Sequence, residues 1–147
     1  MILCANPSAQ FISYQDEIEE AVLSVMRGNR YVLGDEVKKL EEEFADYIGV
    51  KEAVGVANGT DAIELALRVL NIGFGDEVIT VSHTAVATIA AIEATGAKAV
   101  LVDVDEEYYT LNANQLLEVF SYNTRAIIAV HIYGQAADLN TIKKFCY

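Results

Sequence analysis

Residues 53–70, AVGVANGTDAIELALRVL, constrain the fold more than any other stretch of the chain. The stretch opens with a short β-branched run at residues 54–56 and turns at Asn58-Gly59. From Asp61 onward its apolar residues recur at helical spacing. This order predicts a buried strand, a glycine turn and a helix, which together form a βα unit of a parallel sheet.

The start of that helix has the features of an anion site. The first backbone N–H groups of a helix have no partner within it, and its dipole places positive charge there. Phosphate groups bind readily at such a position. The alternative is an ordinary βα turn in which Asn58 or Thr60 caps the helix. In either case we expect Glu64 and Arg68 to face solvent.

Composition limits the class of protein. A chain of 147 residues with 53% hydrophobic residues can bury a core of its own and does not resemble a disordered chain. Its net charge of -12, with scattered basic residues, makes nucleic acid an unexpected partner. Cys4 and Cys146 lie at opposite ends of the chain, so we expect neither a disulfide framework nor a zinc site.

The sequence also predicts where the protein resides. Charged residues interrupt every apolar helical stretch, so no segment is expected to span a membrane. Residues 1–13 lack the basic segment and apolar core of a secretory signal. We therefore expect a cytoplasmic protein.

The chain before residue 53 reads as largely helical. We expect an extended arm over residues 1–11, a helix over residues 15–27 that Ser13 caps, and a helix over residues 36–48 that Gly49 ends. Both helices carry an apolar stripe that we expect to be buried. The stripe residues are Ile18, Val22, Val25 and Met26 in the first helix and Val37, Leu40, Phe44 and Ile48 in the second.

Beyond residue 70 the pattern alternates between strands and helices. The predicted strands span residues 77–82, 98–102 and 126–131, and the predicted helices span residues 85–95, 112–120 and 139–145. Such alternation is typical of an α/β fold with a mostly parallel sheet between two helical layers, a three-layer αβα arrangement.

Four polar clusters follow predicted strands, at residues 58–60, 82–84, 103–105 and 131–135. Right-handed crossovers bring the carboxyl ends of parallel strands to one edge of the sheet, where ligands of such folds bind. The aspartates of the third cluster could bind Mg²⁺, but a structural turn explains them better. The two histidines lack carboxylates at ligand spacing, so no metal site is expected.

Common catalytic motifs are absent from this edge. The chain has no GxxxxGK[ST] phosphate loop and no GxGxxG dinucleotide fingerprint. It also lacks the Gly-x-Ser-x-Gly elbow of α/β hydrolases.

Residues 29–67, 73–112 and 125–142, in this order, resemble the amino-terminal part of the DegT (StrS) family of nucleotide-sugar aminotransferases. The resemblance covers nearly the whole chain. It implies the large domain of a fold-type-I enzyme, pyridoxal 5′-phosphate (PLP) as cofactor and a homodimer. It also implies amino transfer, usually from glutamate, to a keto-sugar on a nucleoside diphosphate. Residues 1–34 would then form an arm, a helix and an entrance loop, and residues 35–147 an incomplete PLP-binding domain.

The resemblance assigns cofactor-binding roles to the turn described above. Gly59 and Thr60 match the family's Gly-Thr turn, which resembles a phosphate clamp, and Asp61 could add its N–H while its carboxylate points away. Residues 82–88 match a loop that covers one face of the cofactor ring. Ala85 stands there where the family often has an aromatic residue.

We hypothesise that His83 makes the ring contact in its place. The alternative is a histidine that caps a helix or packs in the core. By the same resemblance, Arg30 and Tyr31 are candidates for substrate contact. His131 and Tyr133 are further candidates, although packing at a strand end also explains them.

No catalytic residue is assigned within the chain. In the family, the lysine that binds the cofactor and the aspartate that pairs with its ring nitrogen lie later in the sequence, so we expect an inactive fragment. Two alternatives remain at this stage. One is a sugar dehydratase of the same fold, in which histidine replaces the lysine, and the other is a non-catalytic α/β binding domain.

Overall fold

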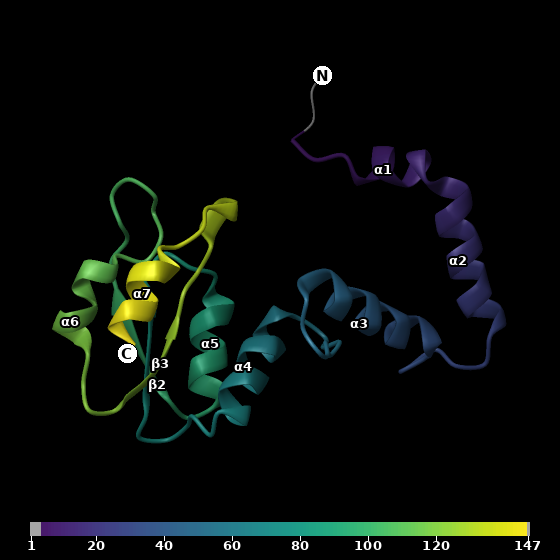
Figure 1. The fold of residues 1–147 in the computed structure, drawn as a ribbon. Helices are drawn as coiled ribbons and strands as arrows, with labels where there is room; N and C mark the ends of the chain where they lie inside the picture. The colour runs from purple at the N-terminus through teal and green to yellow at the C-terminus, as the bar shows by residue number, and fades with distance from the viewer. Residues whose placement is uncertain (1–3, 147) are drawn as a thin grey trace. The chain divides into compact units, whose positions relative to one another are not determined.

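The fold was obtained as a computed structural model that describes residues 4–146. The chain forms two compact units, which divide between Gly55 and Val56. The first contains α1 (Pro7–Ser13), α2 (Gln15–Arg27) and α3 (Asp35–Ile48) (Figure 1). The second contains all the strands that occur among the described residues. No helix within residues 4–146 is both long enough and apolar enough to cross a bilayer.

The predicted extended arm is wrong, because α1 occupies much of it. Asn6 accepts a hydrogen bond from the Ala9 N–H at 3.1 Å, and Pro7 fills the first helical position, which needs no N–H. The predicted cap of α2 is also wrong. The Ser13 hydroxyl donates to the Ala9 carbonyl at 3.0 Å, and Tyr14 precedes α2 without a side-chain bond. The part of the predicted arm at residues 1–3 lies outside the described residues.

The positions of α2 and α3 agree with the prediction, but their predicted burial is wrong. The bounds of α2 match, α3 begins one residue earlier, and Gly49 ends α3 with a left-handed φ of 78°. Within these two helices Ala45 is the buried residue, whereas Met26 and Leu40 are each 62% exposed. Amphipathic helices bury their stripes only where another layer covers them, and the described residues of this unit do not provide one.

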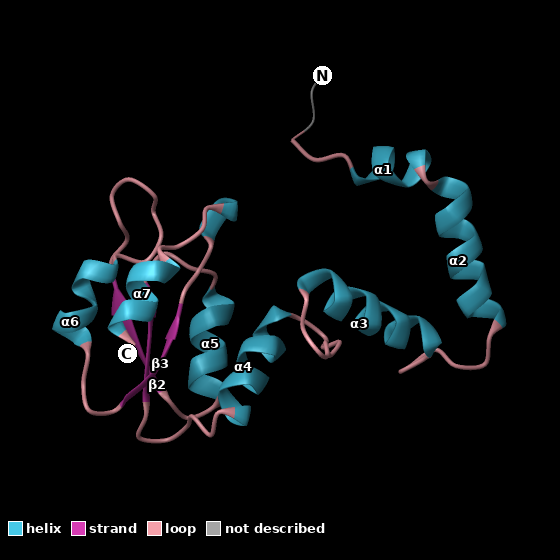
Figure 2. Cartoon of the chain, in the orientation of Figure 1, coloured by secondary structure: helices cyan, strands magenta, loops and turns pink. Residues whose placement is uncertain are grey.

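The second unit is a three-layer sandwich, as predicted. Its sheet has the order β2-β1-β3 and all its strands are parallel. The strands are β1 (Glu77–Val81), β2 (Lys98–Val102) and β3 (Thr124–Ile128). Figure 2 shows α4 (Gly59–Val69) and α5 (Val86–Ala94) on one side of the strands, with α6 (Leu116–Val119) and α7 (Leu139–Phe145) on the other.

The two faces of β1 build two separate cores. Val78 packs in a cluster with Leu67 and Ile92, on the side of α4 and α5. Ile79 and Val81, which point the other way, pack with residues of α6 and α7. Burial of alternate residues on both faces explains why this strand reads as a continuous apolar run.

The predicted strand at residues 54–56 is wrong. Val54 is 77% exposed, and the Gly55 N–H donates to Oε1 of Glu41 at 2.7 Å instead of to another strand. A strand requires a hydrogen-bonded neighbour, and no described strand pairs with this segment.

Most other bounds differ from the prediction by one or two residues, and two segments differ more. In place of one helix over residues 112–120, a 3₁₀ turn (η1, Ala113–Gln115) precedes the short α6, and the side chain of Asn112 caps the turn by accepting from the Asn114 N–H at 3.1 Å. β3 ends at Ile128, before the predicted end at residue 131, and a second 3₁₀ turn (η2, Ile132–Gly134) follows.

Candidate functional site

The amino end of α4 is capped by Asn58. Its Oδ1 accepts the Asp61 N–H at 2.9 Å, and its Nδ2 donates to Oδ2 of Asp61 at 3.1 Å. Asn58, and not Thr60, is therefore the cap. The Asp61 N–H is occupied by this bond, and the Asp61 carboxylate is turned toward Asn58. This leaves the amides of Gly59 and Thr60, for which no acceptor occurs among residues 4–146.

The space beside these amides is open. A Cβ added to Gly59 would meet no atom within 4 Å. N–H groups at the positive end of a helix, beside the open space at Gly59, are suited to bind an anion such as phosphate. The structure thus retains the features that predicted an anion site, with two amides in place of three.

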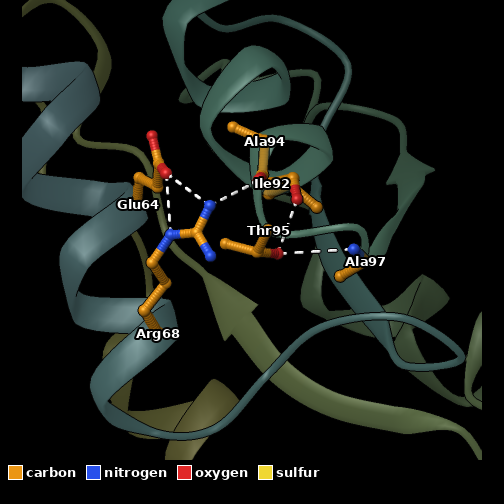
Figure 3. Close-up of polar contacts among 6 residues, drawn as sticks. All are labelled: Glu64, Arg68, Ile92, Ala94, Thr95 and Ala97. Atoms are coloured by element: carbon orange, nitrogen blue, oxygen red, sulfur yellow. Dashed lines mark hydrogen bonds and ion pairs between the residues drawn. The ribbon is translucent and has the colours of Figure 1, made fainter.

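A hydrogen bond joins the carboxyl-terminal turns of α4 and α5 (Figure 3). Nη2 of Arg68, near the end of α4, donates to the Ala94 carbonyl at the end of α5 at 2.7 Å. Nε of Arg68 donates to Oε1 of Glu64, also at 2.7 Å. Arg68 faces solvent as expected, with 51% of its side chain exposed, although it also bonds to α5, whereas Glu64 is half-buried, with 27% exposed.

The direction of the two helices follows from their connections to β1 together with this contact. α5 begins after the carboxyl end of β1, and α4 leads through a short turn into the amino end of β1. Both helices therefore run opposite to the strand, with their last turns joined by Arg68. Their first turns lie at the edge of the sheet where the strands end, which places Gly59 and Thr60 at the edge predicted to bind a ligand.

His83 and Tyr133 come together at the same edge. They follow the adjacent strands β1 and β3, and His83 Nε2 lies 3.1 Å from the Tyr133 hydroxyl. Their ring centroids are 5.8 Å apart, with the ring planes tilted by 55°. Both side chains are exposed, so His83 is not a core histidine. The sequence predicted each residue separately but not the contact between them.

His131 has a different environment. Its Nδ1 accepts the Ala137 N–H at 3.0 Å, which closes the loop that contains Tyr133. This bond gives His131 a structural part in the loop, and a role in substrate contact stays a prediction.

The aspartates at the end of β2 act as turn residues. Oδ1 of Asp103 accepts the Val104 N–H at 2.8 Å, and Oδ1 of Asp105 accepts the N–H groups of Glu107 and Tyr108 at 3.0 Å. Within the part of the chain that the structure describes, no three His, Cys, Asp or Glu residues are grouped to hold a metal.

Asp105 also lines a hollow of about 320 Å³ that reaches Gln135 and Asp138. Hydrogen bonds from the hydroxyl and N–H of Thr141 hold the pKa of Asp138 below its ordinary value. A hydrogen bond to Glu107 raises the pKa of Tyr108, which also lines the hollow. The Asp138 carboxylate in the hollow is thus already bonded within the protein.

Arg30 and Tyr31 belong to the first unit. The Tyr31 hydroxyl donates to the Met26 carbonyl at 3.0 Å, which folds the residue back onto the end of α2. Arg30 and Tyr31 both line a hollow of about 300 Å³ between the end of α2 and the start of α3. Their role in substrate contact stays a prediction.

A protein-family model matches residues 13–147, and it describes the DegT/DnrJ/EryC1/StrS aminotransferase family. The chain belongs to this family. Aminotransferases of the family depend on pyridoxal 5′-phosphate, in agreement with the resemblance seen in the sequence. The match includes α4 and its open amides as well as the loops that carry His83 and Tyr133.

Individual relatives agree with this assignment. The chain is 45% identical over 129 residues to a dTDP-3-amino-3,6-dideoxy-alpha-D-galactopyranose transaminase of Aneurinibacillus thermoaerophilus, covering 88% of this chain and 36% of that protein. It is 42% identical to a UDP-2-acetamido-2-deoxy-3-oxo-D-glucuronate aminotransferase of Pseudomonas aeruginosa, with 87% and 36% covered. The solved structure of DesV from S. venezuelae superposes with a TM-score of 0.93 at 40% identity, over 96% of this chain and 38% of DesV.

The chain matches only one part of each relative. The chain spans about a third of the length of the curated relatives that it matches, 36% in the two cases above. The likeness therefore concerns one part of those enzymes, the part that contains the glycine turn before α4 and the sheet edge.

Proposed function

We propose that the protein containing this chain is a PLP-dependent aminotransferase that acts on a keto-sugar linked to a nucleoside diphosphate of the dTDP or UDP type. Glutamate is the proposed amino donor. The observation that carries the proposal is the identity of 45% to a dTDP-sugar transaminase, continuous over 129 residues. The aminotransferase from P. aeruginosa, which acts on a UDP-sugar, extends the proposal to the second nucleotide.

In this proposal the described residues bind and orient the cofactor. The amides of Gly59 and Thr60, together with the Thr60 hydroxyl, hold the phosphate at the start of α4, and Asp61 contributes through its bonds with Asn58. His83 contacts the cofactor ring. Bound PLP supplies an electron sink for the bonds that change during amino transfer. Arg30 and Tyr31 contact the substrate.

The proposal extends to the organisation of the whole protein. We propose a cytoplasmic homodimer in which residues 1–34 form the arm and entrance loop and residues 35–147 contribute to the PLP-binding domain. The contribution of the present chain is phosphate and ring binding. The groups that bond covalently to the cofactor come from elsewhere in the protein, so the chain alone is proposed to be inactive.

A cofactor titration of the full-length protein tests the proposal. Thr60→Val removes one hydroxyl with little change of shape, and Thr60→Ser restores it. A hydrogen bond to a charged group contributes about 1.5 to 3 kcal/mol, so PLP affinity should fall about tenfold or more in Thr60→Val and recover in Thr60→Ser. Amino transfer from glutamate to dTDP- and UDP-linked keto-sugars should accompany binding.

Three outcomes would contradict the proposal. Loss of the sugar hydroxyl without consumption of glutamate would indicate a dehydratase. A wild-type protein that binds neither PLP nor inorganic phosphate would indicate a binding domain. Equal PLP affinity in Thr60→Val and the wild type would remove the phosphate role of this turn.

A further inference from the structure

The contact between His83 and Tyr133 joins two loops that are 50 residues apart in the chain. The tyrosine side chain is 83% exposed, so burial does not force its hydroxyl toward the imidazole. The distance of 3.1 Å between Nε2 of His83 and the Tyr133 hydroxyl is that of a direct hydrogen bond.

The backbone under Tyr133 is unusual. It has φ 55° and ψ 19°, and Gly134 follows with φ 82°. A bulky residue such as tyrosine rarely adopts this left-handed conformation, which is strained by its own Cβ. Strain that the structure maintains is a common feature of functional sites.

The core does not explain this strain. The side chain that the turn presents is mostly in solvent and packs in neither hydrophobic cluster. The bond from the Ala137 N–H to His131 closes the same loop and holds it in shape. The identified tertiary contact of the Tyr133 hydroxyl is His83.

We propose that Tyr133 is a positioning residue that fixes the ring of His83. The phenol hydroxyl can donate to Nε2 of His83 or accept from it, and in either arrangement the bond favours one tautomer of the ring. The left-handed turn at residues 133–134 brings the hydroxyl into place. The contact of the His83 ring with the cofactor rests on the proposed function. The positioning of that ring by Tyr133 does not.

The test replaces Tyr133 with phenylalanine, which keeps the ring and removes the hydroxyl. The ¹⁵N shifts of the His83 ring, measured by long-range ¹H–¹⁵N correlation without cofactor, should show one tautomer in the wild type. They should show a mixture in Tyr133→Phe. Tyr109→Phe is the matched control, because Tyr109 is also exposed and left-handed, with φ 58°. The control should leave the His83 shifts unchanged.

PLP titration of the full-length protein gives the second measurement. Loss of one hydrogen bond that orders the ring should weaken PLP binding about two- to tenfold in Tyr133→Phe, with no change in the control. The affinity for inorganic phosphate should stay constant, since the Gly59–Thr60 amides do not depend on the hydroxyl.

The outcomes separate this inference from the proposed function. Identical His83 shifts in the wild type and Tyr133→Phe would overturn the positioning role. Changed shifts with unchanged PLP affinity would overturn its link to the cofactor. A wild-type protein that does not bind PLP would refute the proposed function, while the nitrogen shifts would still decide whether Tyr133 positions His83.

Discussion

Arg68 offers the sharpest test of how the second unit is held together. Its guanidinium bonds both to Glu64, four residues earlier in α4, and to the Ala94 carbonyl at the end of α5 (Figure 3). Arg68→Met keeps most of the apolar stem and removes both interactions. The substitution should therefore loosen the contact between the two helices without opening a cavity.

The magnitude follows from the two bonds. A helical ion pair at this spacing contributes about 0.3 to 0.5 kcal/mol when exposed. The hydrogen bond to the Ala94 carbonyl adds about 1 kcal/mol, and not more, because Arg68 is half exposed and water replaces the lost donor. We expect Arg68→Met to lower the free energy of unfolding by about 1 to 1.5 kcal/mol.

Urea unfolding measures this change. With a slope of about 2 kcal/mol per M, the midpoint should fall by about 0.5 to 0.75 M. Lys39→Met is the matched control, since Lys39 pairs with Glu36 at 2.7 Å within α3 and makes no described bond to another helix. Its midpoint should fall by less than about 0.25 M.

Two results would refute this reasoning. Equal, small shifts in Arg68→Met and the Lys39→Met control would show that the bond to the Ala94 carbonyl contributes no stability. If Glu64→Gln were as destabilising as Arg68→Met, the ion pair would account for the whole effect, and the contact between α4 and α5 for none of it.

Three further predictions concern other parts of the second unit. Asn58→Ala removes the cap of α4 and should lower the free energy of unfolding by about 1 kcal/mol in urea, whereas Asn58→Ser, which keeps an oxygen acceptor for the Asp61 N–H, should retain most of the stability. Gly96→Ala places a Cβ on a residue with φ 86°, which should cost about 1 to 2 kcal/mol and lower the Tm in a thermal scan. The hydrogen bond from Ser121, followed by that from Lys98, holds the pKa of Glu77 below its ordinary value of 4.5. A lowered carboxyl pKa stabilises the fold above pH 4.5, and this stabilisation is lost as the pH falls through the folded pKa. Ser121→Ala should therefore raise the Glu77 pKa in an NMR titration and reduce the loss of stability in acid.

The sequence by itself determined the features that depend on neighbouring residues. The bounds of α2, β2 and α7, the left-handed end of α3 at Gly49 and the parallel alternation of the second unit all agree with the prediction. Helical period, capping and glycine at positive φ act over a few residues, so they can be recognised without knowledge of the fold. The family assignment was likewise available from the order of its motifs.

The tertiary structure decided which elements face one another. Residues 54–56 have the composition of a strand but no described partner, and the stripes of α2 and α3 have the spacing of buried faces but remain mostly exposed, with Val25 and Val37 half-buried. Arg68 occupies a position that sequence assigns to solvent, yet it bonds to α5. His83 reaches Tyr133 only because β1 and β3 are adjacent in the sheet. Pairing and burial depend on contacts between distant parts of the chain, and local patterns do not specify them.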